Sequence, residues 1–156
     1  MPLRRAGTRL LAATVTAMAA GIVAGLLARL LMRAVTVLAG GEPGFSLAGT
    51  LAILLVFAGA MLPGAVATAF GRRRSGLVLL GLGAAVLMLE SVAIGLQENP
   101  GQLFGSGGTT TVLVVLVMLA FPPVILGEAL AVWRMTSALA ARRTVPAPRD
   151  DARARR

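Results

Sequence analysis

Four long apolar runs, separated by short breaks rich in glycine, proline or arginine, take up most of this chain. Each run approaches or exceeds the roughly 20 residues that a helix needs to cross about 30 Å of hydrocarbon. In lipid, a helix satisfies its backbone N–H and C=O groups within one segment, so such runs predict membrane-spanning helices. The predicted spans are residues 10–33, 47–70, 76–96 and 110–134.

The sequence therefore predicts an all-α membrane protein, a four-helix transmembrane bundle over residues 1–141. The chain has 156 residues, of which 57% are hydrophobic, and this leaves room for four spans, short loops and little else. Residues 142–156 are rich in Arg, Pro and Asp. Such a composition cannot bury a core, so we expect a disordered cytoplasmic tail.

The start of the chain loosely fits a secretory signal peptide. Arg4 and Arg9 precede the first apolar run, and Ala17-Met18-Ala19 offers small residues of the kind found at cleavage sites. The apolar run continues without a break beyond that point. We therefore expect the first helix to be retained.

The distribution of charge predicts the orientation in the membrane. The net charge is +9, and thirteen of the fifteen arginines lie before the first span, between spans two and three, or from the last residue of the fourth span onward. The loops at the other end carry only Glu42 and Glu98. Positive residues favour the cytoplasmic side, so both termini are predicted to be cytoplasmic in a multi-pass cell-membrane protein. This pattern favours contact with anionic lipids over nucleic-acid binding.

Missing residue types exclude several kinds of chemistry. The chain has no cysteine and no histidine, so disulfides, zinc sites of the usual type and histidine-bound haem have no ligands. The hydroxyls of Ser91 and Thr109–Thr111 have neither histidine nor lysine to activate them. We predict no catalytic residue, no metal, no cofactor and no enzyme activity.

Small residues and prolines predict how the spans pack and bend. Gly21 and Gly25 lie four residues apart in the first span, a spacing that lets another helix approach closely. Pro63 in the second span and Pro122-Pro123 in the fourth each remove backbone donors, so we expect kinks there.

The two outer loops favour the hypothesis of two tandem two-helix hairpins. Each loop contains Glu, Pro and Gly and ends in Gly-Thr, at Thr50 and at Thr109, and a proline follows each threonine after thirteen residues. Two spans per repeat would relate the halves by an axis along the membrane normal. The alternative is that outer loops simply favour glycine, proline and glutamate.

Arg29, Arg33 and Glu90 form a candidate intramembrane polar cluster. The offset between the two halves places Arg33 at a depth similar to that of Glu90, and an unpaired carboxylate in lipid is costly. The arginines could instead anchor to outer phosphates, and Glu90 could be a static partner of Arg29 or Arg33 or a functional carboxylate. Glu128, close to Trp133, is expected to form a surface ion pair at the inner membrane edge.

The chain resembles small four-span membrane proteins of unknown function from high-GC bacteria. The resemblance is carried by Arg29 and Arg33 at the end of the first helix, followed by Gly44-Phe45-Ser46 and Gly49-Thr50. It implies an integral inner-membrane protein and no particular activity. Fluoride channels share a glycine-rich first span that ends in arginine, but their Phe- and Thr-rich third-span break is not matched. Small multidrug transporters need a glutamate in the first span, which has none.

Two functional hypotheses follow from the sequence. The first is a non-enzymatic membrane subunit that acts by helix association, as a homo-oligomer or within a larger complex. It is motivated by the small residues at Gly21 and Gly25 and by the lack of reactive groups. The second is a small transporter or channel, in which Arg29, Arg33 and Glu90 line a polar cavity in the outer half of the membrane.

Overall fold

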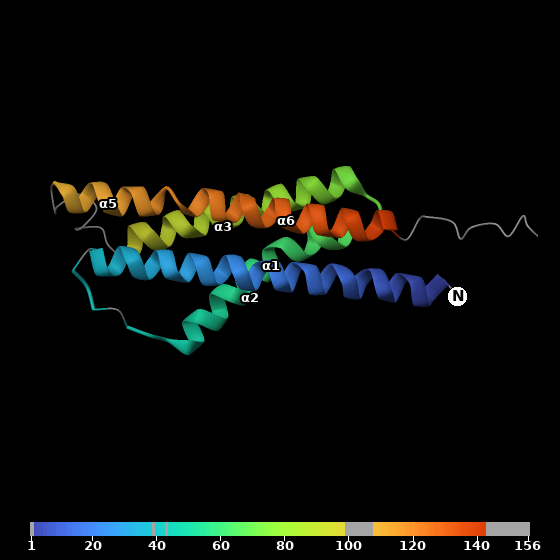
Figure 1. Cartoon of the computed structure of the whole chain (residues 1–156), viewed down its shortest axis with the longest axis horizontal. Helices are drawn as coiled ribbons and strands as arrows, with labels where there is room; N and C mark the ends of the chain where they lie inside the picture. Colours follow the sequence, from blue (N-terminus) through green and yellow to red (C-terminus); the bar gives the residue numbers. More distant parts are fainter. Residues whose placement is uncertain (1, 39, 43, 99–107, 143–156) are drawn as a thin grey trace, which may run out of the picture.

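A computed structural model describes residues 2–38, 40–42, 44–98 and 108–142, and in this part of the chain the regular structure is entirely helical. The helices are α1 (Pro2–Leu38), α2 (Leu47–Ala69), α3 (Arg73–Glu98), α5 (Thr109–Met118) and α6 (Phe121–Arg142). Helices α5 and α6 run end to end (Figure 1) and together form the fourth span. The predicted four-helix transmembrane bundle is confirmed.

Four segments among the described residues are long and apolar enough to cross a membrane. They are Ala6–Leu38, Leu47–Ala69, Arg73–Ile94 and Thr109–Ala141. The first and fourth extend further than the sequence predicted, because α1 begins near the N-terminus and α6 continues to Arg142. The tail expected to be disordered covers residues 142–156: Arg142 is the last residue of α6, and residues 143–156 lie outside the described part of the chain.

Local sequence fixes both ends of α2. The side chain of Ser46 caps the N-terminus, where its oxygen accepts a hydrogen bond of 3.1 Å from the Gly49 N–H. At the other end Gly71 adopts a positive φ of 83°. The Arg72 N–H then donates to the Ala67 carbonyl at 3.0 Å, and the Gly71 N–H donates to Thr68 at 2.9 Å. This is a Schellman motif, and it turns the chain directly into α3.

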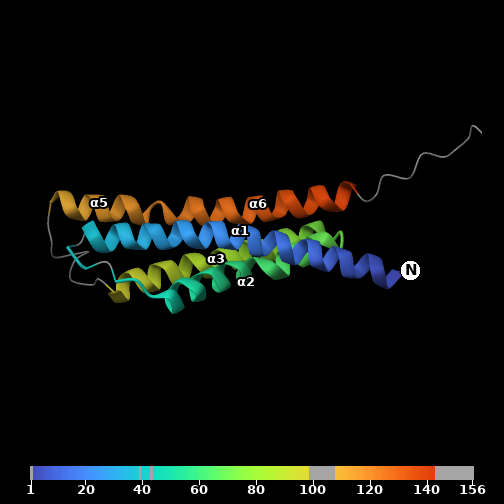
Figure 2. The ribbon, with the colours of Figure 1, turned by 60° about the horizontal axis from the view of Figure 1, so that its bottom comes forward.

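The helices alternate in direction, so successive connections lie at opposite ends of the bundle. The N-terminus, the α2–α3 turn and the end of α6 lie together at one end, and the α1–α2 loop lies at the other (Figure 1). Helix α1 packs against α2, α5 and α6, and α3 packs against α2 and α6. Figure 2 shows α5 and α6 running along the length of the bundle beside α1. Helix α2 also contacts α6, which closes the centre.

The core combines small residues of α1 with large residues from the other helices. Gly21 packs on α2 so closely that a Cβ atom there would lie 2.6 Å from the backbone N and Cα of Ala58. Gly25 faces Leu54, one turn before Ala58 in α2. The small-residue pair predicted for helix packing is therefore used within the chain, between α1 and α2. Buried alanines of α1 face a core that includes Phe57, Met61, Leu87 and Ile125.

The prolines have different consequences in the two halves of the bundle. Helix α2 continues without interruption through Pro63 to Ala69. The fourth span is interrupted at residues 119–120, and Pro122 and Pro123 lie in the first turn of α6. Proline has no N–H, so it fits a first turn better than a helix interior. Duplication of a two-helix hairpin stays a hypothesis, and the halves differ at this point.

Candidate functional site

Arg29 and Arg33 both lie where the end of α1 meets the start of α2. Arg29 is half-buried, and its guanidinium reaches the first turn of α2 beside Gly49. The Arg33 guanidinium carbon lies 5.6 Å from the centre of the Phe45 ring, a distance typical of a cation–π contact. Both arginine side chains therefore point toward the α1–α2 connection.

Glu90 lies on a different helix and faces outward. Its side chain is exposed on α3, whose main neighbours are α2 and α6, whereas both arginines belong to α1. The structure thus brings Arg29 and Arg33 together at one corner and leaves Glu90 on another face of the bundle.

Glu128 is buried inside the bundle, and the expected surface ion pair at the membrane edge is wrong. The residue is only 4% exposed. Both carboxyl oxygens are covered, and neither has a hydrogen-bond partner among the described residues. Trp133, the expected interface residue, also has its ring N–H covered and without a partner there. The cause of the error is the length of α6, which continues nine residues beyond Trp133 to Arg142.

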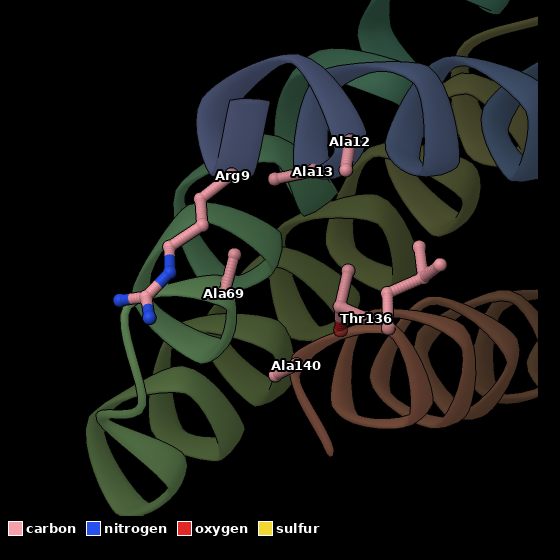
Figure 3. Close-up of a pocket in the computed structure, with 7 residues that line it drawn as sticks. Arg9, Ala12, Ala13, Ala69, Thr136 and Ala140 are labelled. Atoms are coloured by element: carbon pink, nitrogen blue, oxygen red, sulfur yellow. The ribbon is translucent and has the colours of Figure 1, made fainter. Parts of the chain in front are cut away.

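The position of Glu128 along the bundle can be measured from the end that carries the N-terminus and the α2–α3 turn. Arg9, Ala69 and Ala140 line one small cavity there (Figure 3), and the Arg9 side chain extends past Ala69, away from Thr136. Glu128 precedes Ala140 by twelve residues of helix, which corresponds to about 18 Å. Glu128 therefore lies well within the fourth span, Thr109–Ala141, and not at its end.

The buried hydroxyl groups contrast with this carboxyl group. Thr16, Thr68 and Thr136 each donate a hydrogen bond to the carbonyl four residues earlier, at 2.8, 2.8 and 2.6 Å. Ser91 donates to the Leu87 carbonyl at 2.7 Å in the same way. These bonds satisfy the hydroxyls within their own helices. Glu128 has no such partner in the part of the chain that the structure describes, and a polar group buried without one costs several kcal/mol, on the order of 2–7.

A groove between α1 and α6 runs past Glu128. It has a volume of about 570 Å³ and is almost entirely apolar. Small residues on both helices create the space, chiefly Ala20 and Ala24 on α1 and Gly127 and Ala131 on α6. A second cavity of about 370 Å³ lies between α3 and the α5–α6 junction and is lined by residues that include Ser91 and Pro122. The arginines at positions 29 and 33 and the glutamate at position 90 line neither space.

The spacing of residues in α6 contains a signal that could have identified Glu128. The buried residues of this helix are Phe121, Ile125, Glu128, Val132 and Thr136. They follow one another at intervals of three or four, which places them on one face of a helix. A glutamate in that register, between bulky apolar residues, is predicted to face the interior and not the membrane edge.

Comparison with known proteins finds no matching family model and no significant similarity to a curated protein or a solved structure. Function is therefore inferred from the residues and their geometry.

Proposed function

We propose that this integral membrane protein is a non-enzymatic subunit that acts by helix association, as a homo-oligomer or within a larger membrane complex. In this proposal it resides in the cell inner membrane with both termini in the cytoplasm, where its arginines contact anionic lipids. The observation that carries the proposal is the position of Glu90 on the outward face of α3.

A carboxylate at this position favours a protein partner over lipid. Glu90 follows Arg73 by seventeen residues of helix, or about 26 Å, so it lies within the outer part of the hydrocarbon layer. Charged groups at that depth are costly unless they meet a polar partner. A different face of α3, about 140–180° around the helix axis from Glu90, exposes Gly81 and Ala85, and the space beside Gly81 is open. Small residues four apart allow a second helix to approach closely.

A second copy of the chain supplies a suitable partner for Glu90. Arg29 follows Arg9 by twenty residues of α1, or about 30 Å, so its depth is close to that of Glu90. Two copies with the same orientation share these depths, which allows Glu90 of one copy to meet Arg29 of the other. The Gly21–Gly25 pair is already occupied by α2, so the proposed contact uses α3 instead.

Native mass spectrometry of the protein in mild detergent tests this proposal. We expect a discrete oligomer, or a constant second polypeptide if the protein belongs to a larger complex. Gly81→Leu fills the open space on α3 and should weaken association at least tenfold, whereas Gly59→Leu, at an open position on α2, should not. Glu90→Arg should weaken a homo-oligomer, and Arg29→Glu in the same chain should restore it. A monomer at every concentration would contradict the proposal.

A small transporter or channel is the second candidate, and the buried carboxyl group of Glu128 favours it. Ionisable residues at mid-membrane often belong to ion or proton pathways, and the fourth span is interrupted close to this one. We expect proteoliposomes to admit protons faster than empty vesicles, as reported by a trapped pH-sensitive dye. Glu128→Gln should return the rate to that of empty vesicles. Equal rates for the wild type and Glu128→Gln would remove this candidate.

A further inference from the structure

The groove between α1 and α6 has the size and surface of a site for a small lipid-soluble molecule. Its volume of about 570 Å³ lies within the range of roughly 300–1,000 Å³ typical of such sites. Exposed residues of both helices, Val23 and Leu27 on α1 and Met135 on α6, form its edges. Because these edges face lipid, a ligand reaches the groove from the hydrocarbon layer.

Glu128 determines the sign of the charge on a ligand that can bind in the groove. An ionised carboxylate in an apolar interior needs a cation or several hydrogen-bond donors, and without either the group binds a proton and is neutral. The described residues donate no hydrogen bond to either Glu128 oxygen. Arg134 is six residues away, about 9 Å along the axis, and exposed on a different face of α6. Arg29 lies about 8 Å along α1 from Ala24, a residue of the groove wall, and its guanidinium is beside Gly49 of α2.

Depth also excludes two other sources of positive charge. The ammonium group of a phospholipid lies at the membrane surface, and Glu128 lies about 21 Å of helix from Arg142, the last residue of α6. A second copy in the same orientation carries its arginines at the same depths as the first. Neither the phospholipid ammonium group nor the arginines of a second copy therefore lie beside Glu128. A small cation that dissolves in lipid can reach the depth of Glu128.

We propose that the α1–α6 groove binds a lipid-soluble organic cation whose charge pairs with Glu128. The apolar groups of the ligand pack against the small residues of the groove, chiefly Ala20, Ala24, Gly127 and Ala131. Glu128 forms part of the groove wall, and because both of its oxygens are covered, pairing with the cation requires the side chain to rotate into the groove. The site stands independently of the oligomer proposed above, because it lies on a different face of the bundle from α3.

Equilibrium dialysis of tetraphenylphosphonium against the full chain in detergent tests the site. We expect saturable binding of one cation per chain. Glu128→Gln keeps the size of the side chain and removes its charge, so it should lower the affinity at least tenfold. Glu42→Gln, the same change in the α1–α2 loop, should leave the affinity unchanged. Tetraphenylborate has nearly the same shape and the opposite charge, and it should not compete.

A second pair of variants tests the groove without altering the carboxyl group. Gly127→Leu fills the groove and should lower the affinity at least tenfold, whereas Gly59→Leu adds the same side chain at an open position on α2. Circular dichroism measures whether each variant is folded. If Glu128→Gln does not fold, the comparison of Gly127→Leu with Gly59→Leu tests whether the groove is the binding site. The proposal would be overturned if the wild type showed no saturable binding, or if tetraphenylborate competed. It would also be overturned if Gly127→Leu or folded Glu128→Gln bound the cation with the affinity of the wild type.

Discussion

At Gly21 the backbones of α1 and α2 approach more closely than any side chain permits. A Cβ atom at this position would lie 2.6 Å from the backbone N and Cα of Ala58, and 2.8 Å from its Cβ. None of these atoms is the end of a flexible side chain, so α2 itself would have to move. Gly59, one residue further along α2, has open space around it. A side chain is therefore excluded at Gly21 of α1 and tolerated at Gly59 of α2.

We expect Gly21→Ala to lower the free energy of unfolding by about 1–3 kcal/mol, the usual range for overpacking. This loss outweighs the gain of about 1 kcal/mol in helix propensity that alanine brings over glycine. Gly59→Ala should show only that gain. Unfolding with increasing sodium dodecyl sulfate in mixed micelles, followed by circular dichroism, measures both variants. If Gly21→Ala were as stable as Gly59→Ala, the close contact between α1 and α2 would be disproved.

At the scale of the helices, the sequence predicts which segments are helical better than it predicts which side of each helix is buried. The four spans could be identified because each apolar run is long enough to cross a membrane, and this depends only on local composition. The direction that a residue faces depends on the neighbouring helices. Glu90 and Glu128 both lie in apolar runs, yet Glu90 is exposed and Glu128 is buried.

The ends of the helices explain the error at Glu128. The pair Trp133-Arg134 predicts a membrane interface, because tryptophan and arginine are common there. The helix instead continues to Arg142, with Thr136 buried beyond that pair, so Glu128 lies deeper than the sequence suggested. Arg134 is exposed and its long side chain can extend toward the membrane surface, which explains how it can lie within a span.

Most of the exposed arginines gather at one end of the bundle, whereas the half-buried Arg29 and Arg33 lie near the other end. Arg72, Arg73 and Arg74 are exposed at the α2–α3 turn, at the same end as the N-terminus and the end of α6 (Figure 1). The opposite end has Glu42 exposed in the α1–α2 loop. Arginine-rich segments are retained on the cytoplasmic side during insertion, so this distribution predicts that the α2–α3 turn lies in the cytoplasm.

Single cysteines test this orientation directly, because the natural chain has none and each introduced thiol is therefore unique. Ser75→Cys marks the arginine-rich end and Gly44→Cys marks the α1–α2 loop, and both positions are exposed. In intact cells a membrane-impermeant maleimide should label Gly44→Cys and leave Ser75→Cys unmodified, whereas after lysis it should label both. The reverse pattern in intact cells would place the arginines outside. Labelling of both positions before lysis would mean that the chain inserts in two orientations, and the positive charge at one end would then be too weak to fix the topology.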